Sequence, residues 1–225
     1  MHMGSDVRGV VFDFDGVILE SVDVKTRAFV ALFDRWPEHA DAIRALHLEN
    51  TGMSRYEKFV RIHRDILGLP LGDEELARLG DEFGRLIRAE MLSCSFVPGA
   101  RELLERVSVR HRLFIASGTP EEEMRELVEE RGLAGYFTGV YGSPASKGEI
   151  VRRIIEEHAF DPAELVFIGD ALSDYHGARQ ADVAFVARTS PGSEVEFPAE
   201  GVVAKVADMG ELDAQWETLF KGYPA

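Results

Sequence analysis

The sequence predicts an α/β fold, a doubly wound parallel sheet that carries an inserted helical cap domain. Four short apolar runs stop abruptly at small or charged residues, as buried parallel strands do at their carboxyl ends. Apolar residues at helical spacing lie between the later runs, as in Met124, Leu127 and Val128. This alternation of strand and helix patterns is typical of a doubly wound sheet. The four apolar runs span residues 8–12, 113–116, 165–168 and 183–186.

Two helices of the expected sheet region carry start signals. Thr119, Pro120 and Glu122 form a capping box with proline at the first helical position, and Ser146 with Glu149 forms another. We therefore expect one helix to be capped at Thr119 and the next to be capped at Ser146.

The strand pattern is lost between about residues 21 and 93, where only helical periodicity is present. This stretch begins after the acidic turn at Asp15 and ends before residues 97–99, where a proline-glycine pair punctuates the chain. We therefore expect a Rossmann-like α/β core and a helical cap. The predicted core is residues 1–19 with 96–225, and the predicted cap is residues 20–95.

The charge balance narrows the choice of partners. The chain has 40 acidic and 25 basic side chains and a formal net charge of −15, which repels nucleic-acid phosphates and anionic membrane surfaces. We therefore expect neither nucleic acid nor a membrane as a partner. An anionic substrate must be met by a local positive site, made from a metal ion or a few basic side chains.

Cysteine content and hydropathy favour a cytoplasmic enzyme. Cys94 is the single cysteine, so no intramolecular disulfide can form and a reducing compartment is expected. No uninterrupted run of about 18 apolar residues is present to span a bilayer, and no basic, apolar leader opens the sequence. We expect a cytoplasmic location on these grounds.

Acidic residues follow two of the expected strands. Asp13 and Asp15 come after the first strand, and Asp170 and Asp174 come after the run at residues 165–168. Ligands of open α/β sheets bind at these carboxyl ends. Grouped carboxylates repel one another unless a cation lies among them, and all-oxygen ligands suit Mg²⁺. The pattern therefore predicts a magnesium site, although each aspartate taken alone is typical of a surface turn.

A phosphate site is predicted beside these carboxylates. Lys147 lies in the first turn of its expected helix, where a cation opposes the helix dipole at a cost of roughly 0.3–1 kcal/mol. A nearby anion would offset this cost, although a solvated lysine on a helix end is the simpler interpretation of Lys147 alone. Ser117 and Gly118 precede the helix expected to start at Thr119, so a hydroxyl and backbone amides can face a phosphate there. Ser117, Gly118 and Lys147 are therefore the predicted phosphate ligands.

Taken in order, these segments resemble the four motifs of the haloacid dehalogenase superfamily of phosphotransferases. The helical insertion lies between the first and second motifs, which resembles the phosphoglycolate phosphatase and β-phosphoglucomutase-like group with a helical cap. Val17 and Glu20 depart from the pattern, since many relatives carry threonine and aspartate at those positions. The segments similar to the first to fourth motifs are residues 13–17, 117–119, 147 and 169–174.

The resemblance implies a Mg²⁺-dependent phosphatase that removes phosphate from a small phosphorylated metabolite, a phosphomonoester, through an aspartyl-phosphate intermediate. It makes Asp13 the nucleophile, while Asp15 protonates the leaving oxygen and then takes a proton from water. It places Mg²⁺ between the Asp13 carboxylate, the Asp15 backbone carbonyl and the Asp170 carboxylate. Asp174 supports the metal through water or hydrogen bonds.

Other reactions of the superfamily must be weighed against this one. Dehalogenases lack an aspartate at the Asp15 position, and phosphonatases use a cap lysine as a Schiff base, for which only Lys25 and Lys58 are available. A phosphosugar mutase of the β-phosphoglucomutase type keeps both aspartates and is the first alternative. A non-catalytic phosphate-binding module is the second, although the intact acidic residues argue against it.

The cap contains one candidate substrate residue. Residues 51–58 form a glycine turn followed by a capping box, which presents Arg55 near a helix start and resembles the specificity loop of capped relatives. We therefore predict that Arg55 contacts substrate, and a solvated helix face of Arg55, Lys58 and Arg61 is the equal alternative. His63 falls on an apolar stripe and is expected to be packed. Phosphoglycolate, a sugar phosphate and a nucleotide are all retained as substrates.

Overall fold

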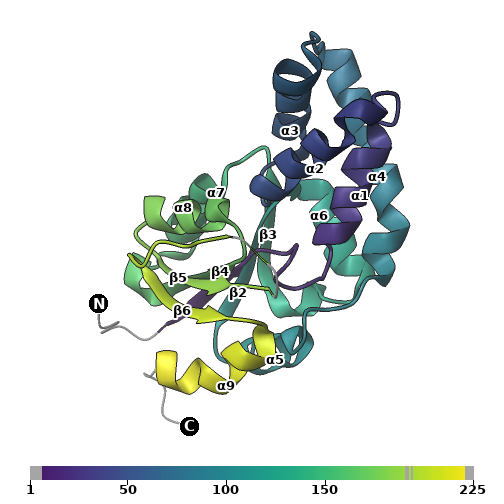
Figure 1. The fold of residues 1–225 in the computed structure, drawn as a ribbon. Helices are drawn as coiled ribbons and strands as arrows, with labels where there is room; N and C mark the ends of the chain where they lie inside the picture. Colours follow the sequence, from purple (N-terminus) through teal and green to yellow (C-terminus); the bar gives the residue numbers. More distant parts are fainter. Residues whose placement is uncertain (1–6, 191–192, 194, 221–225) are drawn as a thin grey trace.

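A parallel sheet of six strands lies at the centre of the computed structural model, which describes residues 7–190, 193 and 195–220 (Figure 1). The strand order is β3-β2-β1-β4-β5-β6, and each pair of neighbours is parallel. The predicted doubly wound α/β fold is therefore confirmed. The strands are β1 (Gly9–Phe12), β2 (Arg112–Pro120), β3 (Phe137–Ser143), β4 (Leu165–Gly169), β5 (Ala184–Arg188) and β6 (Val202–Val206).

The four predicted apolar runs form the four central strands, β2, β1, β4 and β5. The sequence pattern does not predict β3 and β6, which are the two edges of the sheet. Several residues of both edge strands are only partly buried. Because an edge strand is covered less completely, it does not need the continuous apolar run that marks a central one.

Successive residues of β1 point to opposite faces of the sheet, and this divides the core in two. Val10 and Phe12 pack in a cluster with residues of α5 and α9, whereas Val11 packs in a second cluster with residues of α7 and α8. Figure 1 shows α7 and α8 on one side of the sheet and α5 with α9 on the other. Every residue of β1 is therefore buried.

Helices connect the strands and cover the sheet. No helix in the described part of the chain is long and apolar enough to cross a membrane. Short turns of other helix types occur at Pro37–His39, Ile62–Leu67, Ala134–Tyr136 and Pro162–Glu164. The α-helices are α1 (Val22–Leu32), α2 (Ala40–Glu49), α3 (Arg55–Arg61), α4 (Asp73–Ser93), α5 (Ala100–Val107), α6 (Glu121–Glu130), α7 (Lys147–His158), α8 (Leu172–Gln180) and α9 (Met209–Leu219).

Residues 22–93, all of which the structure describes, form helices and no strand, and they stand apart from the sheet as a helical lobe (Figure 1). Four phenylalanines form its centre, with ring centroids 4.6 to 6.2 Å apart. His63 is buried beside them, and its Nδ1 donates a hydrogen bond to the Phe59 carbonyl at 3.0 Å. The prediction of a packed histidine is therefore confirmed. The four phenylalanines are Phe29, Phe33, Phe59 and Phe83.

The two predicted capping boxes differ in outcome. At Ser146 the box is present: the Glu149 amide donates to Ser146 Oγ at 3.3 Å, and the Ser146 amide donates to Glu149 Oε2 at 2.8 Å. At Thr119 the prediction is wrong, because β2 continues to Pro120 and α6 begins one residue later without a side-chain cap. The Thr119 hydroxyl instead accepts a hydrogen bond from Lys25 of the helical lobe.

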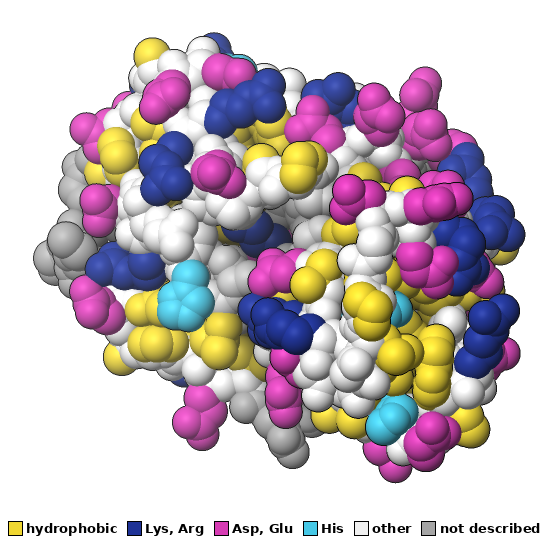
Figure 2. Space-filling model, turned by 90° about the horizontal axis from the view of Figure 1, so that it is seen from above, with side chains coloured by type: hydrophobic (Ala, Val, Ile, Leu, Met, Phe, Trp, Pro, Cys, Tyr) yellow, Lys and Arg dark blue, Asp and Glu magenta, His cyan; other side chains and the backbone are white. Residues whose placement is uncertain are grey.

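The surface mixes charges of both signs around a hollow. Seen from above, acidic and basic side chains are interspersed over this face, and Lys or Arg side chains lie at the edge of a hollow near its centre (Figure 2). The net charge of −15 is therefore not gathered into one acidic patch on this face.

Candidate active site

The carboxyl ends of three neighbouring strands bring the predicted site residues to one edge of the sheet. β1 lies between β2 and β4, and Asp13 follows β1 directly, with its amide still hydrogen-bonded to β4. Ser117 lies in β2, and Asp170 follows β4. Lys147 and Asp174 reach the same edge from the first turns of α7 and α8.

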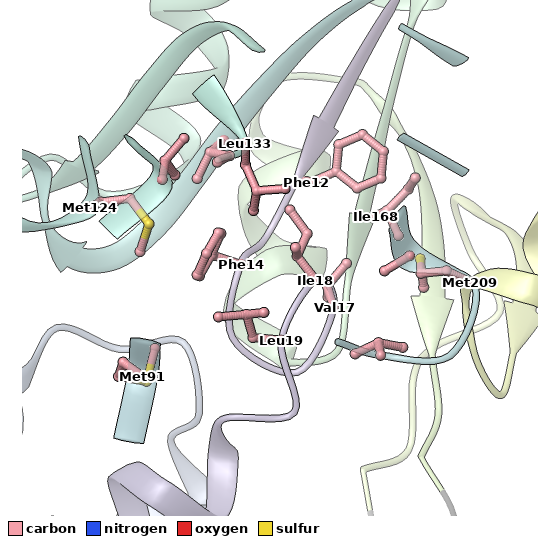
Figure 3. Packing of buried hydrophobic residues seen from close by; sticks show 14 of the residues in the cluster. Phe12, Phe14, Val17, Ile18, Leu19, Met91, Met124, Leu133, Ile168 and Met209 are labelled. Atoms are coloured by element: carbon pink, nitrogen blue, oxygen red, sulfur yellow. The ribbon is translucent and has the colours of Figure 1, made fainter. Parts of the chain in front are cut away.

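The loop after β1 directs Asp13 and Asp15 toward this edge because its apolar side chains are buried. Since Phe14 points into the core, its two neighbours point away from the core. Gly16 makes the turn with a φ of +74°, and a side chain at Gly16 would collide with the Asp170 carboxylate. The loop residues that pack in the core cluster are Phe14, Val17, Ile18 and Leu19 (Figure 3).

Three of the predicted metal ligands form a cluster. Asp13, Asp170 and Asp174 place carboxylate oxygens within 4.8 Å of one another. Asp170 Oδ1 is buried and has no hydrogen-bond partner in the described part of the chain. Clustered carboxylates with a buried oxygen left unpaired are the donors that a hard divalent cation such as Mg²⁺ prefers. The residues of this cluster therefore fit Mg²⁺.

Burial and mutual repulsion raise the pKa values of these carboxyls. Burial, followed by the charge of Asp174, raises the pKa of Asp13 to about 7. Burial, followed by the charge of Asp13, raises the pKa of Asp170 well above its ordinary 3.8. The three groups can all be carboxylates at neutral pH only with cations beside them.

Lys147 supplies one of these cations. Its Nζ lies 2.8 Å from Asp13 Oδ2 and also pairs with the Asp174 carboxylate. Burial opposes the charge of Lys147, but Asp13 and Asp174 outweigh burial and hold the pKa of Lys147 above its usual range. Its side chain is only 5% exposed, so the interpretation of Lys147 as a solvated lysine is wrong.

Ser117 and Gly118 lie beside Asp13 at the end of β2. Ser117 is buried, and its Oγ accepts a hydrogen bond from the Thr119 amide at 3.1 Å. A Cβ atom on Gly118 would lie 2.5 Å from the backbone oxygen of Gly52 in the helical lobe. The backbones of the lobe and the sheet edge therefore meet closely at Gly118, where no side chain fits.

The Asp15 side chain pairs with residues at the start of the helical lobe and is not part of the carboxylate cluster. Its Oδ1 accepts a hydrogen bond from Ser21 Oγ at 2.6 Å, and its Oδ2 accepts one from Lys25 Nζ. Burial raises the pKa of Asp15, but the Lys25 charge and these hydrogen bonds outweigh burial and leave the pKa below its ordinary 3.8. Any contribution of Asp15 to a metal site therefore falls to its backbone carbonyl.

Further contacts hold the helical lobe against the sheet edge. Lys25 Nζ donates to Thr119 Oγ1 at 2.9 Å, and Ser173 Oγ donates to the Thr51 carbonyl at 3.2 Å. A side chain at Gly52 would collide with Ser173 Oγ. The lobe is therefore closed over the site.

Arg55, the predicted substrate residue, forms part of this closure. Its guanidinium donates two hydrogen bonds to Glu123 of α6, at 2.6 and 3.2 Å, and its side chain is only 4% exposed. Lys58 is equally buried, so the solvated helix face proposed for both residues is wrong. Arg55 also lines the pocket beneath the lobe, and its contact with substrate stays a prediction.

The closed lobe and the sheet edge enclose a pocket with about 40 Å³ of free volume. That is room for a few water molecules, since one water needs about 10–15 Å³ by the same measure. The pocket contains both candidate catalytic carboxylates and several cations. Its lining includes Asp13, Asp15, Gly118 and Thr119 from the core and Lys25, His47, Arg55 and Lys58 from the lobe.

The family of the chain is shown by its sequence. A sequence profile of the haloacid dehalogenase-like hydrolases matches residues 7–182 of the 225-residue chain. The chain belongs to this family. The matched range of this haloacid dehalogenase-like hydrolase includes all four motif segments and the whole helical lobe. The predicted resemblance is therefore confirmed.

Curated relatives of this hydrolase include phosphatases. It is 24% identical over 190 residues to a phosphoglycolate phosphatase of Aliivibrio fischeri, covering 80% of the chain and 82% of the relative. It is 29% identical over 121 residues to a 5'-nucleotidase of Pseudomonas aeruginosa, covering 51% of the chain. That second match spans only about half of the nucleotidase, 55% of its length.

Solved structures share the fold at low identity. A predicted phosphatase from Clostridium acetobutylicum superimposes with a TM-score of 0.76 at 20% identity, covering 95% of this hydrolase and all of that chain. CbbY from Rhodobacter sphaeroides in complex with phosphate superimposes with a TM-score of 0.75 at 18% identity, covering 92% and 96% of the two chains. At this level of identity the likeness concerns the fold.

The two residues of this hydrolase that hold Asp15 are not predicted by the sequence pattern. Ser21 and Lys25 lie one helical turn apart, so that both reach the same carboxylate. Their spacing is a usable signal, but only once the start of α1 beside Asp15 is known. His47 is also missed, because it lies in an ordinary amphipathic helix and enters the pocket only when the lobe packs.

Proposed function

We propose that this hydrolase is a Mg²⁺-dependent phosphatase of small phosphomonoesters, with Asp13 as nucleophile and an aspartyl phosphate as intermediate. The observation that supports this most directly is the setting of Asp13. It lies buried on the pocket wall, pairs with Lys147, and has the carboxylates of Asp170 and Asp174 within 4.8 Å. The phosphoglycolate phosphatase relatives and the phosphate complex of CbbY support the same class of substrate.

In the first step, an oxygen of the Asp13 carboxylate forms a bond to phosphorus while the bond from phosphorus to the ester oxygen breaks. The Phe14 amide donates to Asp13 Oδ1 at 2.7 Å and fixes the orientation of the carboxylate. Lys147 offsets the negative charge that nucleophile and phosphate bring together. Because Lys25 holds Asp15 as a carboxylate, Asp15 first takes a proton from the incoming phosphate monoanion and then passes it to the departing ester oxygen.

In the second step, a water molecule attacks phosphorus, the Asp15 carboxylate takes its proton, and the bond between Asp13 and phosphorus breaks. The low pKa of Asp15 beside Lys25 suits the carboxylate form that this base requires. We also propose that residues 20–95 act as a cap that opens to admit substrate. Its closed state limits the water that reaches the intermediate.

Mg²⁺ would be held by the Asp13 and Asp170 carboxylates and the Asp15 carbonyl, with Asp174 in support. Once bound, it neutralises charge between the anionic nucleophile and the anionic phosphate. We expect a chelator to abolish turnover of an aryl phosphate and added Mg²⁺ to restore it. Full activity in excess chelator would contradict this part of the proposal.

The nucleophile is tested by acid quench and mass spectrometry of the variants Asp13→Asn and Asp15→Asn. Asp13→Asn should form no phosphoenzyme, because a neutral amide is a far poorer nucleophile than a carboxylate. Asp15→Asn should still be phosphorylated by an aryl phosphate, whose leaving group needs no proton, and it should accumulate the intermediate. Phosphate on a serine or histidine, or labelling that survives Asp13→Asn, would overturn the assignment.

A further inference from the structure

Lys58 differs from the other buried cations that the structure describes. Its side chain is only 3% exposed, and no carboxylate of the described residues lies within ion-pair distance of it. Each of the other three buried cations has a carboxylate partner. Those pairs are Arg55 with Glu123, Lys147 with Asp13, and Arg188 with Glu20.

The neighbours of Lys58 do not neutralise its charge. Lys58 Nζ donates to His47 Nδ1 at 3.0 Å and lies 5.2 Å from the centre of the Phe29 ring. Burial, followed by the charge of Lys58, lowers the pKa of His47 to about 2, so this histidine is a neutral acceptor. A buried charge without a counter-ion destabilises a protein. A site that keeps one is prepared for an anion that arrives with a ligand.

Lys58 lies in the chamber where the chemistry takes place. Lys58 and His47 line the same pocket as Asp13 and Asp15, and that pocket has about 40 Å³ of free volume. A wider cleft of about 460 Å³ lies beyond Lys25, but Lys58 does not line it. An anionic group that reaches Lys58 must therefore be joined to the phosphoester by only a few atoms.

The charges of this chamber favour a singly charged group. Among the cations that line the pocket, Lys25 is already paired with Asp15 and Arg55 with Glu123, so Lys58 is the one whose positive charge has no carboxylate partner among the described residues. One carboxylate would balance it. A second phosphate, which carries up to two negative charges, would leave an excess of negative charge in a buried space.

We infer that Lys58 is a specificity-determining residue that binds a carboxylate of the substrate, a few atoms from the phosphoester, with His47 orienting its ammonium group. The inference rests on the proposed phosphatase function and adds the chemical class of substrate, a short phosphorylated hydroxy acid. The inference gives Lys58 and Arg55 different roles. Arg55 holds the lobe to α6 through Glu123, and Lys58 selects the substrate.

The test compares three substrates in the presence of Mg²⁺: a two-carbon phosphorylated hydroxy acid, its primary amide, and the two-carbon bisphosphate. The variants are Lys58→Met, Lys58→Gln, and the matched control Arg61→Met, which removes a cation from the same helix that already pairs with Glu57. We expect wild type to prefer the acid. In Lys58→Met, kcat/KM for the acid should fall about 100-fold, mostly through KM, because a buried charge pair is lost.

The amide substrate and the Arg61→Met variant show whether a loss of activity comes from the missing charge pair between Lys58 and the substrate carboxylate. Lys58→Met should hydrolyse the amide at a rate within about threefold of wild type, because the amide has no carboxylate to pair with Lys58. Arg61→Met should hydrolyse the acid at a rate within about threefold of wild type, because it leaves Lys58 in place. An equal loss on acid and amide would overturn the inference, because it would indicate a structural role for Lys58. A wild-type preference for the bisphosphate that Lys58→Met removes would overturn the assignment of a carboxylate.

Binding of phosphonoacetate and of its amide, measured by calorimetry, separates this inference from the proposed function. Wild type could hydrolyse no phosphomonoester and yet bind phosphonoacetate more tightly than its amide, with Lys58→Gln losing that difference in affinity. This result would support the carboxylate site at Lys58 and contradict the proposed phosphatase function. Equal affinity of wild type for the two compounds would overturn the inference even if phosphatase activity is found.

Discussion

Replacing Lys58 by methionine should stabilise the protein while it impairs the proposed site. Burial, followed by the charge of Lys25, lowers the pKa of Lys58 from its ordinary 10.5 to about 7. A base whose pKa is lowered by folding binds more protons in the unfolded chain than in the native one. Between pH 7 and 10.5 the free energy of unfolding of wild type therefore rises with pH, and below about pH 7 the penalty is at its full size.

The size of the effect follows from the same pKa. Each pKa unit corresponds to about 1.36 kcal/mol, so a fall from 10.5 to about 7 corresponds to on the order of 5 kcal/mol against the charged native state. Lys58→Met removes this penalty but leaves His47 Nδ1 without its donor, which costs about 1–3 kcal/mol. We therefore expect the free energy of unfolding to increase by about 2–4 kcal/mol at pH 6.5.

The assay is urea unfolding of wild type and Lys58→Met at pH 6.5 and 9.5, in chelator and without phosphate, so that no ligand occupies the pocket. The gain should shrink as the pH rises, because native Lys58 is neutral above about pH 7 and the cost of removing the proton that the unfolded chain still holds falls toward zero near pH 10.5. Arg61→Met should show no such change with pH. A Lys58→Met variant that is less stable than wild type at both pH values, or whose difference from wild type does not depend on pH, would refute the reasoning.

Three further predictions concern the core of the site. Lys25→Met should raise the pKa of Asp15, so the acid limb of the pH profile of kcat for an aryl phosphate should move to higher pH. An acid limb that does not move would show that Lys25 does not lower the pKa of Asp15. Gly118→Ala places a methyl group 2.5 Å from the Gly52 oxygen, and KM should rise at least about tenfold because the cap cannot close. An unchanged KM would show that the backbones at Gly118 and Gly52 do not need to approach this closely. Asp170→Asn should raise the Mg²⁺ concentration needed for half-maximal activity by about tenfold or more, and an unchanged requirement would remove Asp170 from the metal site.

The centre of the sheet could be predicted because its strands are covered on both faces. β1, β2, β4 and β5 must therefore be apolar almost throughout, and a continuous apolar run is visible in the sequence. The edge strand β3 is partly exposed along half of its length and includes two glycines, so its pattern does not differ from that of a loop. The strand ends that place Asp13 and Asp170 follow from the central strands, which explains why these positions could be derived.

Local sequence signals fail where a contact distant in the chain overrides them. Thr119 has the pattern of a helix cap, but its hydroxyl bonds to Lys25, 94 residues away. Arg55 and Lys58 lie at helix positions that fit a solvated face, yet the lobe packs against the core and Arg55 pairs with Glu123, 68 residues away. Burial of a side chain on a helix depends on what the helix packs against, and one helix's sequence does not contain that information.

The distribution of charge between core and lobe explains why the site needs both. The core contributes the clustered carboxylates of Asp13, Asp170 and Asp174, and a chain with a net charge of −15 cannot attract a phosphate to such a place through its overall field. The lobe contributes Lys25 and Lys58, which line the same pocket. Lys25 is neutralised by a carboxylate of the protein, so it lowers the energy of the closed state before any substrate binds. Lys58 is not neutralised and raises that energy. A substrate that brings its own carboxylate removes this destabilisation, so closure of the lobe is favoured most by the molecules that the pocket is built to select.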